Sequence, residues 1–175
     1  MRRFLVFAAM LTACAPSGNS DADTAETGAD TATGSDTPTA TTGTLAVRFR
    51  IDDDWGDAVL ADGESLLGNY WGDFYLSDDV TGIGPNEGAS ALASVQATDV
   101  DLTDYVNGTE VLLTLADLPA GYVTALGFFD SDGNADPSSP NPDSGDPVTL
   151  PNENEFEVIG GETTEATIYF GFRNP

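Results

Sequence analysis

The chain has 175 residues, of which 30 are acidic and only 5 are basic, so its formal net charge at pH 7 is −25. Such a surface repels nucleic acid and anionic lipid, and it attracts cations and basic partners. The sequence contains no histidine and no lysine, and a single cysteine. These absences exclude Ser-His, Cys-His and Ser-Lys nucleophiles, lysine Schiff bases and zinc sites built from histidine and cysteine. Carboxylate chemistry and oxygen-liking cations remain.

The first residues have the pattern of a secretory signal peptide. Arg2 and Arg3 precede an apolar run from Phe4 to Leu11, and small residues follow up to Cys14. The apolar run is too short to span a bilayer, so we expect residues 1–13 to be a cleaved signal. The residues Leu11-Thr12-Ala13-Cys14 resemble the lipobox of bacterial lipoproteins.

That resemblance implies lipidation of Cys14. In lipoproteins of this kind the thiol takes a diacylglyceryl group, the chain is cut before the cysteine, and the new amine is acylated, commonly with palmitate. Ala15 follows the cysteine, so the aspartate that retains such proteins in the inner membrane is missing. We therefore expect an outer-membrane lipoprotein, facing the periplasm or the outside, whose first partner is the membrane that holds its lipid. One acyl chain anchors only marginally, whereas several hold firmly.

Residues 14–43 predict a disordered linker behind the lipid. Threonine, alanine, glycine, serine and aspartate dominate after the cysteine, and no large apolar side chain occurs. Such a segment cannot bury enough apolar surface to offset the entropy of ordering.

Residues 44–175 predict one all-β domain. The segments with strand-like periodicity are Thr44–Ile51, Trp71–Leu76, Val95–Leu102, Thr109–Leu115, Tyr122–Phe129, Glu155–Ile159 and Glu165–Phe172. A phase slip near Asp99 predicts a β-bulge, and the doubly apolar segment Tyr122–Phe129 predicts a central strand. Helix signal is weak and confined to 57–67 and 87–94. About seven short strands favour a single antiparallel β-sandwich.

The residues Leu118-Pro119-Ala120-Gly121-Tyr122, followed by a strand that ends at Asp130-Ser131-Asp132-Gly133-Asn134, resemble transthyretin-like and carboxypeptidase-regulatory-like domains. The resemblance implies a sandwich in which a Leu-Pro-x-Gly turn leads into a core strand and delivers Asp130 to one end. Tyr122 is then expected to enter the core. Ala135 stands where those domains usually have a glycine.

An Asp-rich, proline-rich loop is the first candidate site. Calcium takes six to eight oxygen ligands, and alternating Asp and Asn on a tight turn supply several of them. A solvated acidic turn with no ion is the alternative. The candidate metal ligands are Asp130, Asp132, Asn134, Asp136, Asp143 and Asp146.

Other clusters offer weaker hypotheses. Asp52-Asp53-Asp54 with Asp57 is either a second cation cluster or a polar strand end. A second set of residues is either a platform for sugar rings or part of the core: Trp55, Tyr70, Trp71 and Tyr75. Arg48 and Arg50 share one strand face, where they pair with carboxylates or hold an anionic ligand.

The sequence as a whole predicts a lipid-anchored envelope module without catalytic activity. Its role is binding, adhesion or structure, with a protein or glycan partner and with calcium as the candidate cofactor. Two alternatives stay open. One is a carboxylate-dependent enzyme such as a glycosidase. The other is a salt-adapted coat or spacer protein with no ligand.

Overall fold

The computed structural model describes residues 40–62 and 65–175, all of which belong to the compact unit Thr37–Pro175. The predictions for the signal peptide, for Cys14 and for the linker up to residue 39 lie outside the described residues.

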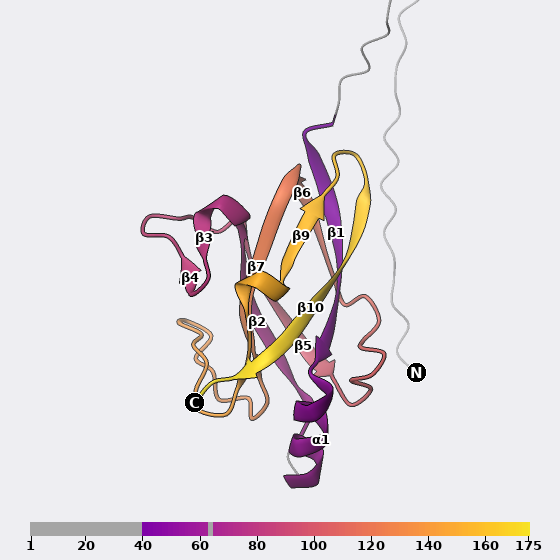
Figure 1. Cartoon of the computed structure of the whole chain (residues 1–175), viewed down its shortest axis with the longest axis vertical. Helices are drawn as coiled ribbons and strands as arrows, with labels where there is room; N and C mark the ends of the chain where they lie inside the picture. Colours follow the sequence, from indigo (N-terminus) through magenta and orange to yellow (C-terminus); the bar gives the residue numbers. More distant parts are fainter. Residues whose placement is uncertain (1–39, 63–64) are drawn as a thin grey trace, which may run out of the picture. The chain divides into compact units, whose positions relative to one another are not determined.

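The described part of the chain is mostly β-strand (Figure 1), as the sequence predicted. The long strands are β1 (Thr42–Ile51), β2 (Leu67–Leu76), β5 (Ala93–Asp101), β6 (Leu113–Pro119), β7 (Gly121–Asp130) and β10 (Thr163–Arg173). The short strands are β3 (Val80–Thr81), β4 (Gly84–Pro85), β8 (Pro147–Thr149) and β9 (Glu155–Val158). The helical elements are α1 (Asp53–Asp62) and the 3-10 turns η1 (Ser77–Asp79) and η2 (Pro151–Glu153).

Eight strands form one curled, nearly barrel-shaped sheet in the order β5-β2-β7-β8-β10-β1-β6, with β9 also paired to β7. β3 and β4 form a separate hairpin that projects from this sheet (Figure 1). The prediction of a purely antiparallel sheet is wrong at one pairing, because β1 and β10 run parallel. Alternating side chains fix which face of a strand is buried but not the direction of its neighbour, so the sequence pattern could not show this.

The core lies inside the curl of the sheet. Leu45, Val47, Phe49 and Ile51 of β1 are fully buried, as the alternation predicted. Four rings from different strands meet at its centre: Phe49, Tyr70, Phe129 and Phe170, with centroids 4.8 to 6.2 Å apart in the contacting pairs. Burying each such ring contributes about 1.5 to 3 kcal/mol.

Two local predictions are confirmed. Thr98 and Asp99 of β5 stand opposite the single residue Asn69, and Asp99 adopts a left-handed φ of 57°, which is a bulge at the predicted place. β7 is central, since it pairs with β2, β8 and β9.

Other local predictions are wrong. Tyr122 is 57% exposed, because the alternation along β7 turns its neighbour Val123 into the core and Tyr122 to the outer face. The helix begins at Asp53 and not at residue 57, because Asp52 caps it: the Asp52 carboxylate accepts from the N–H groups of Asp54 (3.0 Å) and Trp55 (3.3 Å). Residues 87–94 contain no helix.

Candidate functional site

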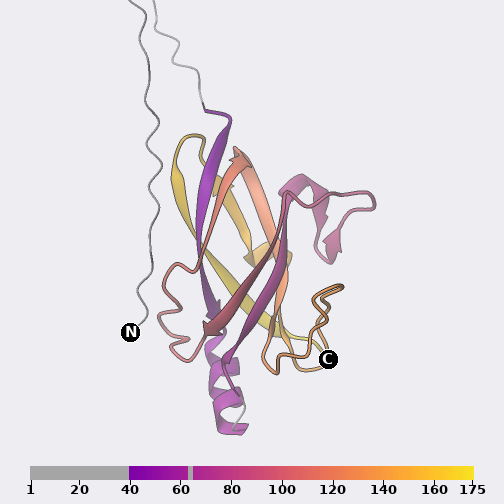
Figure 2. The ribbon, with the colours of Figure 1, turned by 180° about the vertical axis from the view of Figure 1, so that it is seen from behind.

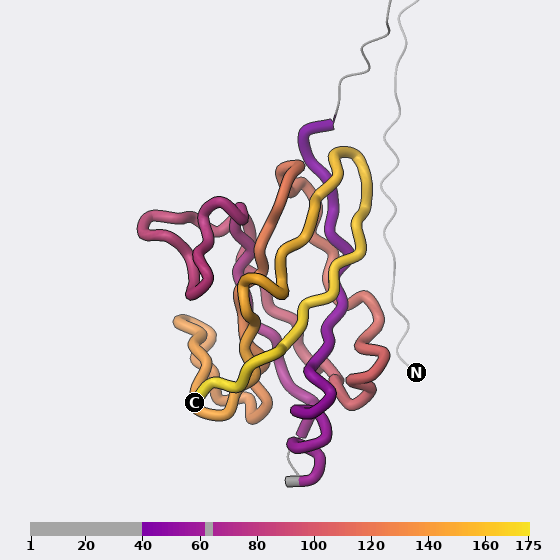
Figure 3. The backbone as a smooth tube through the Cα atoms, viewed as in Figure 1, coloured from indigo at the N-terminus to yellow at the C-terminus, as the bar shows by residue number. Residues whose placement is uncertain are grey.

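The Asp-rich loop joins β7 to β8 and runs beside the last residues of the chain (Figure 3). Asn174 holds it there: its side-chain amide donates to the carbonyl of Asp143 (2.7 Å), and its backbone N–H donates to that of Asp146 (2.9 Å). The guanidinium of Arg173 also donates to the carbonyl of Gly145 (2.7 Å). The loop is therefore tied down by hydrogen bonds from the chain's own end.

Asp130 organises the start of the loop from a buried position, with 1% of its surface exposed. One carboxylate oxygen accepts from the backbone N–H groups of Gly133 (2.8 Å) and Asn134 (3.1 Å), and the other accepts from Ala135 (3.3 Å). Because both oxygens already accept hydrogen bonds from backbone N–H groups, this carboxylate stabilises the turn without any ion.

Four more of the predicted ligands, Asp132, Asn134, Asp143 and Asp146, meet beside it. The side-chain amide of Asn134 donates to the carboxylates of Asp132 (2.8 Å) and Asp143 (2.6 Å). Asp146 is 3% exposed and accepts from the backbone N–H of Asp143 (3.1 Å). The pKa of Asp146 is raised to about 6, chiefly by burial and also by the nearby carboxylates of Asp143 and Asp130, while backbone hydrogen bonds from Asp143 and Ser131 lower it.

Asp136 stands apart, because its carboxylate caps a local turn by accepting from the backbone N–H and hydroxyl of Ser138, each at 2.8 Å. The fold thus brings five of the six predicted ligands into one hydrogen-bonded network. Within residues 40–62 and 65–175, no group of three or more acidic, histidine or cysteine side chains has an arrangement that could hold a metal ion. Calcium binding stays a prediction.

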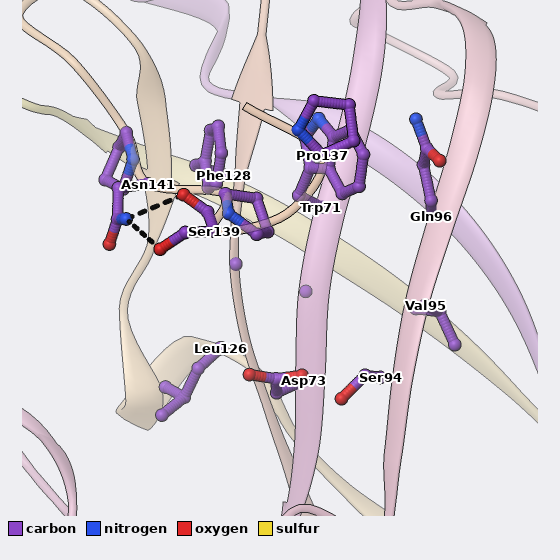
Figure 4. Close-up of a pocket in the computed structure, with 14 residues that line it drawn as sticks. Trp71, Asp73, Ser94, Val95, Gln96, Leu126, Phe128, Pro137, Ser139 and Asn141 are labelled. Carbon is purple, nitrogen blue, oxygen red and sulfur yellow. Dashed lines mark hydrogen bonds between the residues drawn. The ribbon is translucent and has the colours of Figure 1, made fainter. Parts of the chain in front are cut away.

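The proline-rich half of the same loop forms one wall of a groove of about 530 Å³. Pro137, Ser139, Pro140, Asn141 and Pro142 line this wall. The floor is the outer face of β5, β2 and β7. Figure 2 shows these strands from the side opposite to that of Figure 1, and Figure 4 shows the groove at close range.

Two rows of side chains cross the floor, and strand register sets both. In the first row Trp71 of β2 lies between Gln96 of β5 and Phe128 of β7. In the second row Asp73 lies between Ser94 and Leu126. Figure 4 shows the two rows as separate groups, with Pro137, Ser139 and Asn141 near the first row. The groove therefore combines an aromatic row with a more polar one.

The structure divides the predicted aromatic platform. Trp71 lines the groove and is partly buried. Tyr70 is a core residue with no exposed surface, and Trp55 packs against the core from α1. Tyr75 lies on the same outer face of β2 as Trp71 and donates its hydroxyl to Asp73 (3.3 Å). Of the four predicted aromatic residues, only Trp71 lines the groove.

The other acidic and basic candidates have local partners. Asp52 caps α1 and also accepts from the hydroxyl of Tyr169 (2.6 Å), which lowers the pKa of its carboxyl. Arg50 pairs with Asp53 (3.0 Å), and the hydroxyl of Tyr105 donates to Asp57. Arg48 pairs with Glu165 on the neighbouring strand β10 (2.9 Å), as predicted. The acidic residues of the predicted second cation cluster therefore lie at the start of α1, where Asp52 is the helix cap.

Sequence reasoning missed Phe128, Asp73 and Gln96 as groove residues. Each was read as a member of its own strand, whereas the groove depends on which positions of three strands stand side by side. The prolines of the loop were noted, but nothing in the sequence said that they would lie over the sheet.

The chain matches no known protein family, no curated protein and no solved structure. In the part of the chain that the structure describes, no helix combines the length and apolar character that crossing a bilayer requires.

Proposed function

We propose that this protein is a non-catalytic binding module of the bacterial cell envelope that holds a glycan in the groove between the loop 137–142 and the outer face of β2, β5 and β7. The observation that carries the proposal is the pair of rows on the groove floor, one aromatic and one polar.

The lining suits a sugar ring better than a purely apolar ligand. Trp71 and Phe128 are cross-strand neighbours and offer apolar contact of the kind that the axial C–H face of a sugar needs. Asp73, Gln96 and Asn141 supply a carboxylate and two amides around them. Small-molecule sites have this composition: an apolar surface with a few polar groups that fix orientation.

The lining of the groove favours binding of a glycan over its hydrolysis. Glycoside hydrolysis requires two carboxyl groups placed on either side of the scissile bond. Asp73 is the one carboxylate among the residues that line the groove, and its oxygen accepts a hydrogen bond from Tyr75 (3.3 Å). A single carboxylate orients a hydroxyl but does not provide an acid and a nucleophile.

A glycan array followed by calorimetry tests the proposal. The full-length protein is screened, and each glycan that binds is titrated into wild type, Trp71→Ala and Tyr122→Ala. Tyr122 is a matched control, because it is an exposed aromatic residue of β7 outside the groove. We expect Trp71→Ala to weaken binding about tenfold or more, because truncation of a central aromatic contact costs more than about 1 kcal/mol, and Tyr122→Ala to leave it unchanged. Absence of any glycan ligand, or equal losses in both variants, would contradict the proposal.

We also propose the membrane address from Cys14 and its lipobox-like surroundings. In a diderm host, wild type should incorporate labelled palmitate and sediment with the outer membrane, and Cys14→Ser should do neither. Wild-type protein that carries no lipid would refute the anchor while leaving the groove proposal intact.

For the fold we propose a transthyretin-like sandwich. β5, β2, β7 and β9 form one layer, and β6, β1, β10 and β8 form the other. The pairings within each set and the shared core between them support this division. The turn at Ala120 between β6 and β7 supports the Leu-Pro-x-Gly resemblance.

A further inference from the structure

The two ends of the curled sheet are β5 and β6, and neither pairs with a second strand in the described part of the chain. Each therefore presents a row of backbone N–H and C=O groups without ladder partners, which is a template for an added strand. This seam lies beside the proposed glycan groove and shares with it only Val95 among the residues named for the two sites.

A cleft of about 550 Å³ lies at one end of this seam, where residues 102–112 connect β5 to β6. Asp99 and Asp101 of β5 form one side, and Thr109, Glu110 and Leu112, which lead into β6, form the other. The segment 109–112 is fixed to β1, since Thr109 and Leu112 donate to the carbonyls of Phe49 and Val47, each at 2.9 Å. The cleft is thus bounded by two firmly held pieces of backbone.

The core is incompletely covered at the seam. Val95 of β5 and Leu113 and Leu115 of β6 pack against the buried core but are themselves only partly buried. Leu112, which precedes β6 and lines the cleft, is 45% exposed. An added strand whose inward residues were apolar would cover these side chains and gain about 25 cal/mol for each Å² removed from water.

The charges at the cleft indicate which outward-facing side chains an added strand would carry. Asp99, Asp101, Asp104 and Glu110 line it, and no basic residue does. A second copy of this acidic chain would bring like charges together, whereas a basic segment would neutralise them.

From these observations we propose that the seam between β5 and β6 binds an extended basic segment of a partner protein by strand addition. The segment alternates apolar residues, which cover Val95, Leu113 and Leu115, with Lys or Arg, which face Asp99, Asp101 and Glu110. Backbone hydrogen bonds to the free edges provide affinity, and the alternation provides specificity.

The test uses a peptide of four Lys-Val repeats, titrated into the full-length protein by fluorescence anisotropy. Two control peptides accompany it: four Glu-Val repeats, and the Lys-Val peptide with alternate backbone nitrogens methylated. We expect only the unmodified Lys-Val peptide to bind. We also expect hydrogen exchange to slow at β5 and β6 when it does.

Matched charge variants locate the site. Asp99→Asn, Asp101→Asn and Glu110→Gln combined should weaken binding about tenfold or more; asparagine suits the left-handed φ at position 99. The combination Asp78→Asn, Asp79→Asn and Glu87→Gln removes the same charge beside the projecting hairpin, and it should change binding less than about twofold. Trp71→Ala should have no effect, which separates this site from the glycan groove.

The inference is overturned if no binding of the Lys-Val peptide occurs, or if the methylated peptide binds equally well, since simple charge attraction would then suffice. Equal losses in the two charge variants would overturn it as well. So would self-association of the protein through β5 and β6 in place of peptide binding.

Discussion

The hydroxyl of Tyr70 occupies the space above Gly72, two residues further along the same inner face of β2. A Cβ atom at position 72 would overlap that hydroxyl and its ring carbon. Gly127, opposite Gly72 on β7, leaves room for the same ring. The hydroxyl itself is fully buried and has no hydrogen-bond partner among residues 40–62 and 65–175, and burial strongly raises the pKa of this phenol.

Tyr70→Phe should therefore stabilise the protein. An unpaired buried hydroxyl costs about 1 to 3 kcal/mol, and phenylalanine keeps the ring contacts with Phe49 and Phe170. We expect an increase of about 1 kcal/mol in the free energy of unfolding, measured by urea denaturation. A loss of stability would mean that the hydroxyl has a partner in solution.

Gly72→Ala should destabilise the protein by about 1 to 3 kcal/mol, because it overpacks the same space. In the Tyr70→Phe background part of the clash is gone, so the cost of Gly72→Ala should fall. A double-mutant cycle measures this coupling. Strict additivity would show that the two residues do not share the space.

Asp52 links the start of α1 to β10 through Tyr169. Asp52→Ala removes both the helix cap and the acceptor of the Tyr169 hydroxyl, so we expect a loss of about 1 to 2 kcal/mol. Asp54→Ala, in the same first turn, is the control, and it should cost less. The lowered pKa of Asp52 adds a pH effect: this stability is present above its ordinary pKa of 3.8 and is lost as the pH falls through the folded-state value. Equal losses in the two variants would refute the cap.

Asp146 should give the opposite pH dependence. Its pKa is about 6 in the folded protein and 3.8 ordinarily, so between these values the folded chain holds a proton that the unfolded chain has released. The contribution of Asp146 to stability is therefore fully present below pH 4 and falls by about 3 kcal/mol as the pH rises through 6. In chelator, Asp146→Asn should be more stable than wild type at pH 7 and similar to it near pH 3.5. Parallel pH profiles for the two proteins would contradict this account.

Calcium, if it binds the loop, should relieve this destabilisation. We expect calcium to raise the melting temperature of the wild-type protein above that in chelator or in sodium chloride of equal ionic strength. Asp130→Asn and Asp146→Asn should lose the response. Asp136→Asn should keep it, because Asp136 lies outside the network of the other five predicted ligands. Equal responses to calcium and to sodium chloride would remove the calcium hypothesis and favour adaptation to salt.

The sequence pattern predicted the strands best where alternation was clean. Leu45, Val47, Phe49 and Ile51 were placed on the buried face correctly, and the slip at Asp99 was a bulge. The pattern could not predict β8, whose three residues carry too little periodicity, or the parallel pairing of β1 with β10.

The candidate site was predicted in part, for a related reason. Asp130 to Asp146 lie close in sequence, so local spacing anticipated that most of them would meet. The groove depends on the register that sets Gln96, Trp71 and Phe128 side by side, and register is a property of three strands together.

Asn154 shows how a polar residue in a loop can hold the sheet together. It is fully buried between η2 and β9, and its amide donates to the carbonyls of Leu150 and Tyr169, each at 3.0 Å, while its oxygen accepts from the N–H of Tyr169 at 2.7 Å. Asn154→Ala removes all three hydrogen bonds, including both to the backbone of Tyr169, while the Leu150 carbonyl still accepts from the N–H of Glu153 (3.1 Å), so we expect a loss of about 3 kcal/mol.

Asn154→Asp should cost at least as much as Asn154→Ala. A carboxylate of the same shape keeps the acceptor for the Tyr169 N–H but points its second oxygen at two carbonyls, and burying that charge is costly. Its deficit should shrink at acid pH, where protonation restores a donor. Asn152→Asp, at an exposed position of η2, is the control that tests added charge alone. Urea denaturation at pH 4 and pH 7 measures all three variants. Equal stability of Asn154→Asp and wild type at pH 7 would show that the hydrogen bonds between Asn154 and Tyr169 do not hold β10.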